Sequence, residues 1–211
     1  MLKFKTSGMK SLLFVLAISI SGCSITADEI EAMYDQPGLP GYLTKDVSEF
    51  DGTSRITLAP SFIGDGGNLL RLGLRWNSSL PDNKMILVAE WGEPENFDPK
   101  MPLKLNIDGT RLDLPPVDKR GYGEFIDKVY SSATMLSTSS ITLKETHKQY
   151  WISRSELSQV IEAQKVVVRV ELLKSYWEER LEPTVEDIQA PKLWAKMAFA
   201  KFLSEQSSIS N

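Results

Sequence analysis

The stretch that decides the fold is Leu103-Lys104-Leu105-Asn106-Ile107-Asp108-Gly109-Thr110-Arg111-Leu112-Asp113-Leu114. Its two arms alternate apolar and polar residues with a period of two, which is typical of β-strands that bury one face. The dipeptide Asp108-Gly109 lies between the arms and favours the tight turn of a β-hairpin. The sequence therefore predicts an antiparallel hairpin over residues 103–114.

The chain before this hairpin has the same character. Residues 54–60 and 70–76 alternate, and the second segment carries arginine on one face and leucine on the other. This pattern predicts two half-buried strands. Residues 84–91 are more continuously apolar, which favours a central strand.

The chain after the hairpin begins with a long connection. Residues 115–139 open with Pro115-Pro116, and we expect an irregular surface segment there with a weak helix over residues 124–130. Residues 140–152 and 165–172 predict further strands, and residues 176–181 predict a strand that pairs back on the latter.

Two helices complete the prediction. Ser153 and Glu156 fit a capping box, with Leu157, Val160 and Ile161 as the buried side of the short helix that follows. Pro191 is predicted to begin a second helix that runs to about Glu205 and packs on a sheet.

These elements define the fold class. Strands and helices do not alternate regularly, which disfavours a parallel doubly wound sheet. We predict an α+β fold: mainly an antiparallel β sandwich or partly open barrel, with a short mid-chain helix and a C-terminal helix packed on the sheet. One β-rich globular domain is expected over residues 43–206, followed by a frayed tail at 207–211.

The N-terminus has the order of a secretory signal. Lys3, Lys5 and Lys10 lie in a segment without acidic residues, and the apolar run over residues 12–20 follows. A membrane-spanning helix needs ~20 apolar residues, so this run is too short for a permanent anchor. The run ends in Ile20-Ser21-Gly22-Cys23.

This arrangement resembles the signal peptide and lipobox of bacterial lipoproteins. The resemblance implies that residues 1–22 are removed, that the sulfur of Cys23 receives a diacylglyceryl group, and that the new amino terminus is acylated. Ser24 in place of aspartate implies an outer-membrane location facing the periplasm. The alternative is a buried cysteine in an apolar N-terminal helix.

The resemblance also defines the mature chain. Removing 22 residues with three lysines leaves 189 residues with 21 basic and 28 acidic side chains, a net charge of −7. Residues 23–42 become a membrane-proximal tether, with two helical turns expected over residues 27–34. The expected partner at this end is the membrane, through the acyl chains.

Composition excludes several classes of protein. With 42% hydrophobic and 25% charged residues among 211, the chain has the composition of a globular protein. A single cysteine excludes an intramolecular disulfide framework and a cysteine-bound iron–sulfur cluster. A net charge of −4 gives no general footprint for nucleic acid. No cofactor is predicted.

Candidate catalytic and metal-binding features are weak. His147 is the one histidine and lies in the polar stretch 144–149, which we interpret as exposed or at a sheet edge. Residues 64–68 are glycine-rich but are not followed by Gly-Lys-Ser/Thr, so they are interpreted as a hairpin loop. Glu90, Glu93, Glu95 and Asp98 lack calcium-loop spacing, and a solvated acidic turn is favoured over an ion site.

Two features suit binding. Asp118, Lys119, Arg120 and Tyr122 form a candidate recognition loop with two glycines, and a plain solvated turn is the alternative. An aromatic patch is the second candidate, although core or cross-strand packing is favoured for its members, Tyr150, Trp151, Tyr176 and Trp177.

Three functions are consistent with this sequence. We favour a lipid-anchored envelope lipoprotein that acts without catalysis, by binding an envelope component or a secreted protein. One alternative is a carboxylate-dependent envelope hydrolase of peptidoglycan or another glycan, which needs two carboxylates ~5–9 Å apart. The other is an inhibitor or immunity-type protein against a secreted enzyme.

Overall fold

The computed structural model describes residues 32, 36–37, 39–64, 69–81, 83–93, 95–117, 124–134, 137–182 and 194–209, with backbone only at 124–134 and 137–145. These residues form strands and two helices, α2 (Arg154–Glu162) and α3 (Ala195–Ile209). The strands are β1 (Leu43–Val47), β2 (Ser54–Phe62), β3 (Leu70–Asn77), β4 (Lys84–Trp91), β5 (Leu103–Ile107), β6 (Thr110–Leu114), β7 (Glu124–Thr134), β8 (Ser137–Ser153), β9 (Val166–Glu171) and β10 (Tyr176–Arg180).

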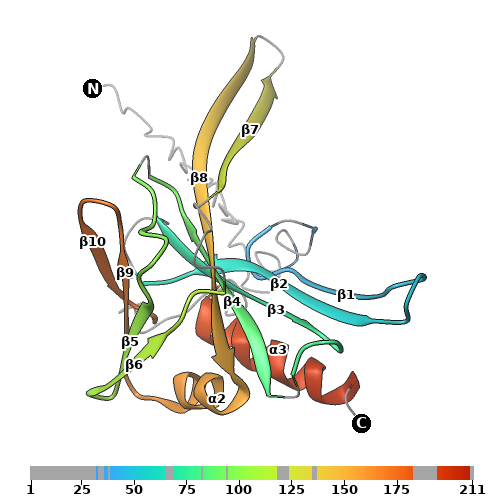
Figure 1. Ribbon diagram of the computed structural model, residues 1–211. Helices are drawn as coiled ribbons and strands as arrows, with labels where there is room; N and C mark the ends of the chain where they lie inside the picture. Colours follow the sequence, from blue (N-terminus) through green and yellow to red (C-terminus); the bar gives the residue numbers. More distant parts are fainter. Residues whose placement is uncertain are drawn as a thin grey trace, which may run out of the picture.

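The strands lie in two sheets. The larger sheet has the order β1-β2-β3-β4-β8-β7, and the smaller has the order β10-β9-β5-β6. Neighbouring strands in both sheets pair antiparallel. Figure 1 shows the smaller sheet beside the larger one, with α2 and α3 below them. The predicted mainly antiparallel α+β fold is confirmed, and the sheets do not close into a barrel.

The hairpin of residues 103–114 is confirmed as β5 and β6. Its register runs from Leu103 opposite Leu114 to Ile107 opposite Thr110. Asp108 has φ 49° and Gly109 has φ 92°, so both central residues adopt the positive φ that a type I′ turn requires.

The core lies between the larger sheet, the smaller sheet and the helices. One row of paired residues crosses the larger sheet on its covered face: Leu43, Leu58, Leu74, Leu87 and Tyr150. Phe199 and Phe202 of α3 belong to the same hydrophobic cluster, as do Val166, Val168 and Val170 of β9. The alternation read from the sequence therefore directs one face of each sheet into a shared core.

The segment after Pro116 differs from the prediction. Residues 124–134 form β7 and not a weak helix, and β7 pairs with β8 from Glu124–His147 to Thr134–Ser137. The reason is tertiary: β8 offers a free edge, and aromatic and β-branched residues such as Phe125, Ile126 and Val129 suit a strand. Figure 1 shows this hairpin extending beyond the rest of the sheet.

The C-terminal helix ends later than the sequence predicts. The predicted fraying from residue 207 is wrong, because α3 continues to Ile209. Arg154 of α2 holds this turn: its Nη1 donates to Gln206 Oε1 at 2.6 Å, and its Nη2 donates to Ser207 Oγ. Pro191, the predicted first residue of this helix, lies outside the described residues.

The capping box at the start of α2 is confirmed. The Glu156 amide donates to Ser153 Oγ at 3.2 Å, and the Ser153 amide donates to Glu156 Oε2 at 2.6 Å. Leu157 and Val160 are buried and Ile161 is partly buried. Within the described part of the chain, no helix has the length and apolar character needed to cross a membrane.

Candidate functional site

The exposed face of the smaller sheet carries rows of charged residues. One row crosses the sheet as Glu178, Arg169, Lys104 and Asp113. The next row places Val167 beside Asn106 and Asn106 beside Arg111. Because alternate residues of β9 enter the core, the charged residues between them all emerge on the opposite face.

A groove of about 540 Å³ lies on this face, and we call it the outer groove. Its lining residues are Lys104, Leu105, Asn106, Arg111, Lys165, Val167, Arg169 and Glu178. Four of the eight are cations and one is an acid, in a chain whose net charge is −4. The outer groove is therefore locally electropositive on an acidic protein.

Glu171 positions two of the groove cations. Its carboxylate forms ion pairs with Lys104 and with Arg169, whose Nε lies 3.0 Å from Oε1. The hydrogen bond from Lys104, together with that from Arg169, holds the pKa of Glu171 below its ordinary value. One carboxylate thus binds two cations and fixes the positions of both at this end of the groove.

The other two groove cations differ in their pairing. Arg111 binds Asp113 through two hydrogen bonds of 2.7 and 2.8 Å, which raises the pKa of Arg111 and lowers that of Asp113. Lys165 is exposed, and in the described part of the chain its ammonium group has no carboxylate within ion-pair distance. Lys165 is therefore the cation most available to a partner.

An aromatic side chain lies beside the outer groove. The guanidinium carbon of Arg169 lies 3.7 Å from the centre of the Tyr176 ring, a geometry that favours cation–π attraction. Tyr176 is 55% exposed and belongs to β10, an edge strand of the smaller sheet. Its ring therefore both orients Arg169 and adds apolar surface at the groove rim.

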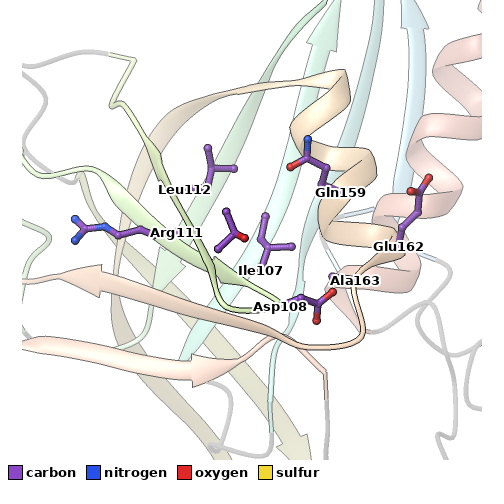
Figure 2. A pocket seen from close by; sticks show the side chains of 8 residues that line it. Ile107, Asp108, Arg111, Leu112, Gln159, Glu162 and Ala163 are labelled. Carbon is purple, nitrogen blue, oxygen red and sulfur yellow. The ribbon is translucent and has the colours of Figure 1, made fainter.

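A second cavity of about 380 Å³ lies between the β5–β6 hairpin and α2. Figure 2 shows Gln159 and Glu162 on the helix, and Asp108 at the turn beside Ala163. Arg111 lines this cavity as well as the outer groove, and its side chain extends away from α2 in Figure 2.

Asp108 in this second cavity has a structural role. Its Oδ2 accepts the Gln164 amide at 3.0 Å, and its Oδ1 accepts the Lys165 amide at 2.7 Å. Both oxygens therefore hold the link between α2 and β9, the link that also carries Lys165 to the outer groove. Asp108, which the sequence predicts only as a hairpin-turn residue, therefore also joins the β5–β6 turn to the link between α2 and β9.

The predicted position of His147 is wrong. His147 lies in β8 between β4 and β7, its side chain is 20% exposed, and its Nε2 is 3.2 Å from Glu90 Oε2. Glu90 is buried and also pairs with Arg71 of β3. This row could not be predicted from the sequence because it depends on the pairing of β8 between two other strands.

The acidic cluster of residues 90–98 is divided among different partners. Glu90 belongs to the buried row and not to a solvated turn. Glu95 accepts hydrogen bonds from the Lys174 amide and from Ser175 Oγ at 2.7 Å, and the latter contact lowers the pKa of its carboxyl group. In the residues that the structure describes, no three His, Cys, Asp or Glu side chains are placed to hold a metal ion.

The four candidate aromatic residues lie in two sheets. Tyr150 is fully buried in β8, and Trp177 of β10 packs on Trp91 with ring centres 5.5 Å apart. The favoured interpretation, packing, is confirmed for these two. Tyr176 differs because it is exposed beside Arg169, as described above.

Lys148 is a buried residue that sequence reasoning missed. It is 6% exposed on the covered face of β8, and its Nζ donates to the backbone carbonyls of Asp98 and Met101. Burial lowers its pKa from 10.5 to about 8. Its signal in the sequence was one lysine in a polar strand, which is ordinarily an exposed residue.

The remaining predicted sites lie outside the described residues. These are the lipidation site Cys23, the recognition-loop residues Asp118, Lys119, Arg120 and Tyr122, and residues 65–68 of the glycine-rich loop. Comparison with known proteins found no matching family model, no matching curated relative and no matching solved structure. The candidate site therefore rests on the geometry of this chain alone.

Proposed function

We propose that this chain is a lipid-anchored envelope lipoprotein whose globular body acts by binding a partner at the outer groove. The anchor is supported by the basic segment, the short apolar run and the lipobox that ends at Cys23. The groove supports binding: four cations on one exposed sheet face, on a chain with a net negative charge, is the observation that carries the proposal.

The groove chemistry favours binding over glycan hydrolysis. Hydrolysis by the usual carboxylate mechanisms needs an acid and a second carboxylate on either side of the scissile bond. Glu178 is the one acid among the residues that line the outer groove. Two carboxylates, Asp108 and Glu162, line the second cavity, but both oxygens of Asp108 already accept backbone amides.

The anchor is tested by replacing the acylated residue. Cys23→Ala should abolish incorporation of labelled fatty acid and release the protein from membranes, because no thiol remains for the diacylglyceryl group. Ser24→Ala is the matched control and should retain the label. Labelling that persists in Cys23→Ala would overturn the anchor.

The binding role is tested by cross-linking from the groove. A photoreactive side chain replaces the exposed Asn106 inside the groove, or the exposed Arg75 of β3 in the other sheet. In intact envelopes, the Asn106 position should capture a discrete partner and the Arg75 position should not. Equal capture from both positions, or capture from neither, contradicts the assignment of the groove as the binding face.

A further inference from the structure

We infer that the outer groove binds an extended acidic polypeptide segment that lies along the strand direction. The inference rests on the proposed binding function and adds the class of ligand. It is carried by the spacing of the groove cations, their unequal pairing, and the acids that flank Arg169.

The cations occupy three successive rows of the smaller sheet. Arg169 and Lys104 form the first row, and Arg111 lies in the second, opposite Asn106. Lys165 stands two residues before Val167, directly ahead of β9, and supplies the third. Rows that share a face repeat every two residues, or about 6.6 Å.

An extended polypeptide has the same repeat. Its alternate side chains project to one side about 6.6–6.8 Å apart, so carboxylates at positions i, i+2 and i+4 match the three rows. Between the cations, Val167 contributes apolar surface, and the amide of Asn106 contributes a donor for a backbone carbonyl. The Asn106 oxygen itself accepts the Gly109 amide at 2.9 Å.

The acids of the face disfavour a flat, dense anionic surface. Glu178 lies directly opposite Arg169 across the β9–β10 pair, and Glu171 stands two residues beyond Arg169 on β9. A phosphate-rich lipid surface would bring its charges against these carboxylates as well as against the cations. A chain with spaced carboxylates engages Lys165, Arg111 and the first row while its intervening side chains face away.

The test uses the full chain purified in a neutral detergent and two synthetic nine-residue peptides of identical composition. One peptide alternates glutamate with threonine, and the other places its glutamates in one block. Binding is measured by fluorescence anisotropy of the labelled peptides at low ionic strength. The alternating peptide should bind more tightly than the block peptide, and added salt should weaken its binding because the contacts lie at the surface.

Two protein variants locate the site. Lys165→Glu should weaken binding of the alternating peptide by about fivefold or more, as expected for reversal of an exposed charge contact. Lys201→Glu makes the same charge change on the exposed side of α3 and should leave binding within about twofold. Unchanged thermal unfolding shows that both variants are folded.

Several results would overturn the inference. Equal affinity for the two peptides indicates attraction by net charge alone. Binding of tripolyphosphate or of phosphatidylglycerol vesicles, without binding of the alternating peptide, assigns the groove to phosphate. Loss of a self-associated state in Lys165→Glu, without peptide binding, assigns it to a second copy of this chain. In each case a partner cross-linked from Asn106 in envelopes would still support the proposed function.

Discussion

Lys148 gives the sharpest quantitative prediction, because its ammonium group is buried on the covered face of the larger sheet. Its Nζ donates to the carbonyl of Met101 at 2.7 Å and to that of Asp98, and it lies 5.0 Å from the centre of the Tyr150 ring. Burial lowers its pKa from 10.5 to about 8. The unfolded chain therefore binds this proton more tightly than the folded chain does.

The sign of the pH effect follows from this difference. Between the folded pKa of about 8 and the unfolded pKa near 10.5 the unfolded state carries more protons, so raising the pH stabilises the folded state. Each pH unit inside that window contributes up to about 1.4 kcal/mol. From pH 7.5 to 9.5 the free energy of unfolding should therefore rise by about 2 kcal/mol from Lys148 alone.

The assay is urea unfolding followed by tryptophan fluorescence at pH 7.5, 8.5 and 9.5. Measurements stop below pH 10 because burial raises the pKa of Tyr150, and ionisation of that phenol in the unfolded chain then opposes the rise. Lys148→Met should remove the rise, and Lys201→Met, at an exposed lysine of α3, should retain it. Equal pH slopes in Lys148→Met and the unmodified chain would refute the reasoning.

Three further substitutions test particular contacts. Asp108→Ala should lower the free energy of unfolding by about 1–2 kcal/mol because two backbone amides lose their acceptor. Asp108→Asn should lower it less, since one acceptor oxygen remains. Equal losses in denaturant titrations of the two variants would contradict this. Arg154→Ala should speed hydrogen exchange in the last turn of α3 and lower the free energy of unfolding by about 1–2 kcal/mol. Unchanged protection of these amides from exchange would show that the Arg154 guanidinium does not hold the turn. Gly73→Ala should lower the free energy of unfolding by about 1–3 kcal/mol, because a Cβ there would lie 2.6 Å from the Leu58 carbonyl oxygen. An unchanged melting temperature would show that the backbone of β2 can shift to make room for the Cβ.

Local features could be predicted from the sequence. The turn at Asp108-Gly109 and the capping box at Ser153 depend on residues within three or four positions of each other, and the structure has both. The outward and inward faces of β3 also followed from its own alternation, since Leu70, Leu72 and Leu74 are buried. These features need no knowledge of distant partners.

Features that depend on strand pairing could not be predicted. His147 was expected to be exposed or at a sheet edge because its neighbours are polar, and it is partly buried because β7 and β4 flank β8. Lys148 likewise enters the core because two carbonyls of the β4–β5 connection lie where its amine can reach them. The outer groove combines Lys104 and Arg111 with Lys165, from segments about 60 residues apart. Its cluster of cations can therefore be recognised only once the pairing register of β5 and β9 is known.

The order of strands has a consequence for how the chain folds. The chain leaves the larger sheet after β4, builds the β5–β6 hairpin, returns to the larger sheet as β7 and β8, and leaves again as β9 and β10. Lys84 pairs with Ser153, and Ile107 pairs with Val166. Pairing between strands far apart in the sequence forms slowly, because the entropy cost of closing the intervening loop precedes the stabilising contacts. An emerging N-terminal half has no partner for the free edges of β4 and β5, so neither sheet can be completed until β8 and β9 have been made.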